Sequence, residues 1–76
     1  FRKNTLLEIS VNEPQYLIIS VYDASGRQIR TLFEGQLIPQ QIHKIQLEGA
    51  GLASGTYLIR VQGDTFSQSR TVTFIK

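Results

Sequence analysis

The sequence predicts an all-β fold, and two observations support that prediction. Apolar and polar side chains alternate along nearly every segment, as they do in strands with one buried face, and no segment shows the helical period of about 3.6 residues. Turn signals separate the segments at intervals of about 8–12 residues, which is typical of small sandwiches and barrels. We therefore expect an immunoglobulin-like antiparallel β-sandwich of about seven short strands with Greek-key connections.

Two strands are predicted near the start of the chain. The first has an inward row of apolar side chains, at Leu7, Ile9 and Val11. Residues 12–15 interrupt the ladder, because Pro14 has no N–H to donate and favours a turn. The second strand has an inward and an outward row, which are Leu17, Ile19 and Val21 on one side and Tyr16, Ile18, Ser20 and Tyr22 on the other.

A hairpin is predicted to connect the second strand to a third. Its turn is Asp23-Ala24-Ser25-Gly26, in which aspartate accepts hydrogen bonds from the turn itself and glycine tolerates a left-handed backbone. The return strand carries Ile29 and Leu32, whose spacing of three residues predicts a β-bulge near residues 30–31. We expect residues 34–41 to form a longer connection, with Gly35 and Pro39 as strand breakers.

The second half of the chain contains three more alternating segments. The first has His43, Ile45 and Leu47 on one face, and it ends at a flexible corner, residues 49–51, with Leu52 tucked beneath. A turn at Ser54-Gly55 leads into the second, whose inward residues are Tyr57, Ile59 and Val61. After a short hairpin at Gly63-Asp64, the last strand has Val72 and Phe74 inward and Thr71, Thr73 and Ile75 outward.

The composition is that of one small domain. The chain has 76 residues and a formal net charge of +2, and its cations are scattered rather than gathered in the dense basic surface that nucleic acids require. It has no cysteine, which excludes disulfides and thiolate metal sites. The longest aliphatic run, Leu17-Ile18-Ile19, is far too short to span a membrane. Because the sequence begins with Phe1, we expect residues 1–76 to be the C-terminal domain of a larger exported protein.

The sequence predicts no enzyme, no cofactor and no metal site. It contains no phosphate-binding glycine loop, no nucleophile elbow and no motif with metal-ligand spacing. His43 is the single histidine, and no carboxylate lies near it in the sequence. We expect it to be half-buried and hydrogen-bonded rather than a metal ligand or a general base.

Three segments resemble the C-terminal sorting domain of proteins exported by the type IX secretion system of Bacteroidetes-type bacteria. They are Val21-Tyr22-Asp23-Ala24-Ser25-Gly26-Arg27, Leu52-Ala53-Ser54-Gly55-Thr56-Tyr57 and the terminal strand that ends at Lys76. Gly35 and His43 fit the connection that joins these motifs in the family. The resemblance covers nearly the whole chain, from about Thr5 to Lys76, and implies an immunoglobulin-like sandwich.

The resemblance also implies a function as a secretion signal or docking domain. Such domains cross the inner membrane with their cargo, fold in the periplasm and are recognised by the outer-membrane translocation machinery. The cargo then reaches the cell surface or the extracellular space, and a cell-surface signal peptidase removes many of these domains while it attaches the cargo. The implied partners are therefore the translocation and attachment proteins and an upstream cargo domain.

We expect recognition to involve the exposed edge of the terminal strand. Strand addition at that edge would supply backbone hydrogen bonds, and nearby cations would steer an acidic receptor. The candidate receptor contacts are Arg70, Thr71, Thr73, Ile75 and Lys76. In the alternative interpretation, Arg70 and Lys76 only protect an edge strand from aggregation.

Other residues of the motifs have structural interpretations. Gly26 and Gly55 fit turns, Tyr57 fits the core with its hydroxyl at the rim, and Arg27 fits a pair with Asp23 or Glu48. The outward Tyr16, Ile18 and Tyr22 either line the sheet or form a protein contact.

Two alternatives to the secretion signal remain at this stage. One is a structural immunoglobulin-like module that packs against an upstream catalytic or adhesive domain and has no signal activity. The other is self-association into a homodimer that exchanges the terminal strand.

Overall fold

A computed structural model describes residues 2–76, so the expectations that concern Phe1 lie outside the described residues. These residues form six antiparallel strands, which are β1 (Asn4–Ile9), β2 (Gln15–Tyr22), β3 (Gln28–Leu37), β4 (His43–Glu48), β5 (Gly55–Gln62) and β6 (Ser67–Phe74). One sheet has two strands in the order β1-β4, and the other has four in the order β3-β2-β5-β6. The all-β prediction is confirmed, with six strands in the described part of the chain in place of about seven.

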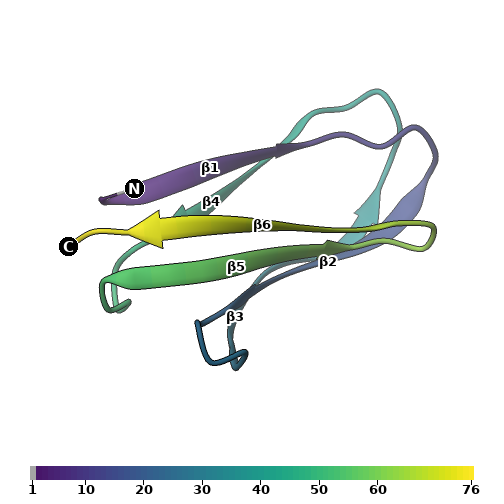
Figure 1. The fold of residues 1–76 in the computed structure, drawn as a ribbon. Coiled ribbons are helices and arrows are strands. Elements are labelled where there is room, and N and C mark those ends of the chain that lie inside the picture. The colour runs from purple at the N-terminus through teal and green to yellow at the C-terminus, as the bar shows by residue number, and fades with distance from the viewer. Residues whose placement is uncertain (1) are drawn as a thin grey trace.

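The two sheets enclose one apolar core, as the face-to-face ribbons in Figure 1 indicate. The inward rows predicted for β2 and β5 are confirmed, since Leu17, Ile19 and Val21 are fully buried and Ile59 is nearly so. Leu7 of β1 and Leu47 of β4 meet them from the other sheet. A second cluster, formed by Val11, Leu17 and Leu37, extends this core.

The expected connection over residues 34–41 is wrong in its first half. β3 continues through Gly35 to Leu37. The second half of this strand, Phe33 to Leu37, pairs without interruption with Ile19 to Gln15 of β2. The strand persists because Leu37 is fully buried and because the ring of Phe33 fills the space beside Gly35, at 3.3 Å from where a Cβ would stand. The start of β2 is also earlier than expected, because Gln15 is already paired and buried.

The predicted bulge is present as two irregularities that flank residues 30–31. The β2–β3 register shifts between Ile19 and Ser20 and again between Val21 and Tyr22, which leaves Leu32 and Ile29 without directly opposed partners. Bulges increase local twist. Both Ile29 and Leu32 pack against the main core despite their irregular spacing.

The corner at residues 49–51 makes two backbone hydrogen bonds. The Gly49 amide donates to the Lys3 carbonyl, and the Leu52 amide donates to the Gly49 carbonyl. A Cβ at position 49 would lie 2.3 Å from Cε1 of Phe74, so only glycine allows β6 to pack so closely against this corner. Leu52 is buried beneath it, as predicted. The start of β1 and the C-terminal residues that follow β6 lie at this end of the sandwich (Figure 1).

Candidate functional site

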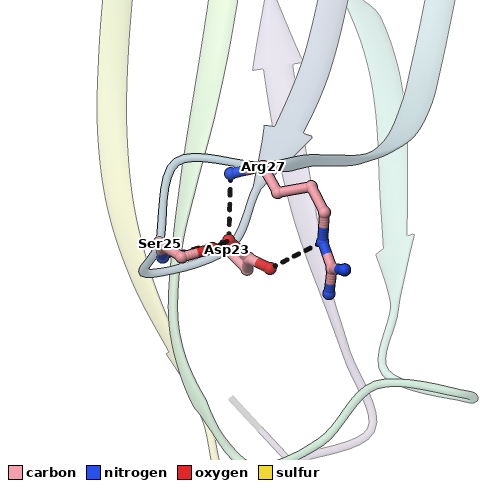
Figure 2. A network of polar contacts seen from close by, with 3 residues as sticks. All are labelled: Asp23, Ser25 and Arg27. Carbon is pink, nitrogen blue, oxygen red and sulfur yellow. Dashed lines mark hydrogen bonds and ion pairs between the residues drawn. The ribbon is translucent and has the colours of Figure 1, made fainter.

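The Asp23 carboxylate organises the first of the family-like motifs. Its Oδ1 accepts hydrogen bonds from the Ser25 hydroxyl at 2.6 Å, the Ser25 amide at 3.0 Å and the Arg27 amide at 3.0 Å. Its Oδ2 lies 3.3 Å from Nε of Arg27, which confirms the predicted Asp23–Arg27 pair (Figure 2). Gly26 completes the turn at a φ of 89°, the left-handed backbone expected of it.

These contacts lower the pKa of Asp23 below its ordinary value of 3.8. The largest cause is the hydrogen bond from the Ser25 hydroxyl, followed by the one from the Arg27 amide. All of the donors favour the ionised carboxylate, so the turn holds a negative charge that its own residues stabilise. The side chain of Arg27 is 78% exposed beside it, which leaves most of the guanidinium open to a partner.

The second motif forms the loop that enters β5. The Tyr57 ring is buried, as predicted, and its hydroxyl donates to the Ala53 carbonyl, which closes the loop. Ser54 holds the end of the chain, because its hydroxyl oxygen accepts a hydrogen bond from the Lys76 amide at 2.9 Å. Gly55 begins β5 with a φ of 159°, close to an extended backbone.

The two motifs and the C-terminal residues meet at one end of the sandwich. Residues 23–30 and 51–57 line a shared hollow of about 520 Å³. The Arg30 side chain joins β3 to the corner, because it donates to the Glu48 carbonyl at 2.7 Å and to the Ala50 carbonyl at 3.2 Å. We call the surface formed by residues 23–30, 49–57 and 75–76 the motif end.

The five candidate receptor contacts do not form one cluster. The register of β5 with β6 places Arg70 opposite Ile59, whereas Thr71 and Thr73 are opposite Leu58 and Thr56. Directly opposed residues of an antiparallel pair share a face. Arg70 therefore lies on the inner face of β6 with Val72 and Phe74, and Thr71 and Thr73 lie on the outer face. Ile75 and Lys76 follow the strand at the motif end.

Gly35 and His43 lie away from the motif end. His43 is half-buried as expected, but Nε2 is buried without a hydrogen-bond partner, and the ring packs near Phe33 with centroids 6.5 Å apart. Among residues 2–76, no group of His, Asp and Glu side chains is placed to hold a metal ion. Gly35 and His43 therefore occupy packing positions.

The outward row of β2 begins away from the motif end. Tyr16 is 42% exposed at the other end of β2, and its hydroxyl donates to the Glu34 carboxylate at 2.7 Å. That hydrogen bond, with smaller effects from desolvation and from the charge of Glu34, raises the pKa of Tyr16. Tyr22 and Ile18 are half-buried on the same face. The three side chains therefore lie on one sheet face.

Comparison with known protein families shows which family the chain belongs to. The family model described as the secretion system C-terminal sorting domain matches residues 3–76. The chain belongs to this family. The match includes both motifs, the terminal strand and every strand of the structure. No curated protein and no solved structure gives a significant match to the chain.

Family membership gives the function of the sorting domain at the level of the whole chain. It is a type IX secretion signal that directs translocation across the outer membrane, so it is not an enzyme, and its cargo passes to the cell surface or the medium. No helix in residues 2–76 is long and apolar enough to cross a membrane.

Two residues that shape the motif end were not singled out from the sequence. Arg30 has the spacing of an ordinary polar strand residue, and Gly49 belongs to a corner for which the sequence predicts no specific contact. Their roles depend on contacts with Glu48, Ala50 and Phe74, which lie 18–25 residues away. For Gly49, the pair of glycines around Ala50 was the available signal.

Proposed function

We propose that the type IX translocation machinery recognises this sorting domain in its folded form, and that the motif end is the surface it contacts. In this proposal, residues 1–76 act as one C-terminal sorting and docking domain of a larger exported protein. After transit, the cargo is attached to the cell surface or released, and a cell-surface signal peptidase acts on this domain or leaves it as a docking module.

The convergence of the two motifs and the C-terminal residues is the observation that supports this proposal. The motifs at residues 21–27 and 52–57 are 25 positions or more apart in the sequence, yet both contribute residues to the lining of the same hollow. The hydrogen bond from the Lys76 amide to Ser54 adds the chain end to that surface. A partner that reads this surface distinguishes a folded domain from an unfolded one, because unfolding separates all three segments.

The charges at the motif end favour an acidic partner. Asp23 is neutralised locally by Arg27, whose side chain remains largely exposed. Lys76 adds a second exposed cation, and Ile75 beside it is 50% exposed. Complementary charge of this kind accelerates association and fixes orientation. The exposed Thr71 and Thr73 extend this contact along the outer face of β6, and Arg70 contacts the partner from the other face.

The strand order is compatible with an immunoglobulin-like assignment, which we include in the proposal. In that family of folds, the sheets are ABED and CFG, with C′ added beside C in variable types. The pair β1-β4 would correspond to strands B and E, and β3-β2-β5-β6 to C′, C, F and G. The place beside β1 that strand A would occupy is taken by no strand among residues 2–76.

The proposal is tested by export of a periplasmic reporter that carries this chain at its C-terminus, in a host with the type IX machinery. Truncation is a poor test, because removal of residues 73–76 also removes the buried Phe74. We instead use the double variant Arg27→Glu/Lys76→Glu, with Arg60→Glu as the control. Arg60 is an exposed cation on the outer face of β5, opposite Ser20 and Ser69.

We expect the double variant to lower the reporter outside the cell by about tenfold, which corresponds to about 1.4 kcal/mol of lost affinity, while the control exports normally. Circular dichroism of both purified proteins checks that they remain folded. Normal export of a folded double variant would show that the motif end is not the contact surface.

A further inference from the structure

One side of the sandwich is open along its length. The two-stranded sheet is narrower than the four-stranded sheet that it covers, and β4 makes its contacts with β3. The edge of β1 that does not face β4 therefore points toward the β5-β6 side. Residues of β1 and β6 line one hollow on this side.

A groove follows this open side. Its central part, of about 260 Å³, lies between Leu7 to Ile9 of β1 and Gln68 to Arg70 of β6, with Ile59 and Val61 of β5 beneath. A second hollow of about 450 Å³ continues it toward Val11 and Phe66 and shares part of the same lining. We call both hollows together the β1–β6 groove.

The floor of the groove is apolar, and its side chains are incompletely covered. Ile9 and Val61 pack against the core but remain half-buried, while Leu7 and Ile59 are buried beside them. Elsewhere in the core, the corresponding inward residues of β2 are fully buried. The groove is thus the place where added apolar side chains would complete the core.

One wall of the groove is a strand edge that is free to accept hydrogen bonds. Among residues 2–76, β1 pairs with β4 alone, so the backbone groups on its other edge have no strand partner there. An unpaired edge next to an apolar groove is the arrangement that accepts an extended segment in β-strand addition.

The positive charge of Arg70 at the rim of the groove favours an added segment that carries an acidic side chain. Arg70 is exposed on the inner face of β6 at the groove, and the one ion pair among the described residues joins Arg27 to Asp23. Glu8 lines the same hollow from β1, but no ion pair joins it to Arg70. A carboxylate on the added segment would supply one.

We propose that the β1–β6 groove accepts an extended segment of the translocation machinery, which pairs with the free edge of β1, places apolar side chains over Ile9 and Val61, and presents an acidic side chain to Arg70. This inference rests on the proposed function and adds a second contact site, on β1, to the contact at the motif end. It assigns strand addition to the edge of β1 rather than to the outer edge of β6.

A pair of neighbouring substitutions tests the groove in the reporter export assay. Gln68 lines both hollows, whereas Ser67 is opposite Gln62 on the outer face of the same strand, and both residues are exposed. Gln68→Trp fills the groove and should lower export by about tenfold, and Ser67→Trp should change it less than about twofold. Equal export of the two variants would overturn the proposal.

The wild-type reporter separates this inference from the proposed function. If the wild-type chain exports nothing, the proposed function itself fails. If the wild-type chain and Gln68→Trp export equally while Arg27→Glu/Lys76→Glu does not, the groove proposal alone fails. Thermal unfolding of both tryptophan variants distinguishes a filled groove from an unfolded domain.

Cross-linking identifies what occupies the groove. The chain has no cysteine, so Gln68→Cys and Ser67→Cys each introduce a single thiol for a photoactivatable label in the full-length precursor. We expect the label at position 68 to cross-link to an acidic, extended segment of an outer-membrane translocation protein, and the label at 67 not to do so. Cross-links from position 68 to an upstream segment of the same precursor, or to a second copy, would overturn the assignment.

Discussion

The motif end and the β1–β6 groove are built in opposite ways. At the motif end, Asp23, Ser54 and Arg30 are hydrogen-bonded, and Gly49 packs directly against Phe74. Along the groove, Ile9 and Val61 are half-buried and one edge of β1 has no strand partner within residues 2–76. One region is complete within the described chain, and the other has apolar surface and backbone groups left to satisfy.

This difference separates two ways in which a folded signal can be read. A surface whose polar groups are already hydrogen-bonded presents side chains in fixed positions, so a partner recognises it by shape and charge. An incomplete sheet offers backbone hydrogen bonds and apolar area, so its contribution is affinity that depends little on the sequence of the partner. The contrast predicts that the motif end is sensitive to small structural changes and that the groove tolerates them.

The largest effect on stability is expected at the motif end, for Gly49→Ala. The added Cβ would meet the ring of Phe74 at 2.3 Å, and the ring is buried, so the corner or β6 must shift. Overpacking of this kind lowers the free energy of unfolding by about 1–3 kcal/mol. Urea denaturation of the purified domain measures it.

Gly35→Ala is the matched control, because its Cβ would lie at the milder distance of 3.3 Å from the half-buried Phe33. The double variant Gly49→Ala/Phe74→Leu should lose less stability than the sum of its single variants, since the smaller side chain removes the clash. Additive losses would mean that the corner and β6 are not packed against each other as described.

A smaller effect, with a defined pH dependence, is expected for Asp23→Asn. The folded chain holds the pKa of Asp23 below its ordinary value of 3.8, so the charged turn stabilises the fold above that pH. As the pH falls through the lower pKa of the folded state, this stabilisation is lost. The denaturation midpoints of wild type and Asp23→Asn should therefore differ near neutral pH and converge in strong acid.

A difference between these two midpoints that stays constant from neutral pH into strong acid would contradict the role given to the Asp23 carboxylate. Ser25→Ala offers a second check, because the Ser25 hydroxyl supplies the largest contribution to the lowered pKa. That variant should move the pKa of Asp23, followed by NMR, back toward its ordinary value.

The smallest effect on stability is expected in the groove. Gln68→Trp places an apolar ring over half-buried side chains at an exposed position, so the free energy of unfolding should change by less than about 0.5 kcal/mol. Thermal unfolding measures this change. A loss as large as that of Gly49→Ala would mean that the groove is as tightly packed as the motif end, and the contrast between the two regions would fail.

Strand positions and inward rows were predictable because they depend on local alternation. The rows of β2 and β5 and the buried Phe74 follow from that pattern alone. The pattern failed at Gly35, where pairing with Leu17 and cover from Phe33 keep a glycine inside a strand. The spacing of Arg70, two residues before Val72, predicts its place on the inner face.

The convergence at the motif end and the groove could not be predicted from local pattern. The convergence depends on which strands pair, because residues 21–27 and 52–57 meet only through the β2–β5 ladder. The groove depends on the unequal widths of the two sheets, which no single segment encodes. The family resemblance supplied the function of the chain without either of these features.

The most direct test of the account is whether this chain, fused to an inert periplasmic reporter, carries it across the outer membrane of a host with the type IX machinery. Protease accessibility of the reporter on intact cells, together with its amount in the medium, measures the exported fraction. The account predicts that most of the reporter lies outside the outer membrane and that it stays in the periplasm when the machinery is deleted. A folded fusion that remains in the periplasm of the intact host would contradict it.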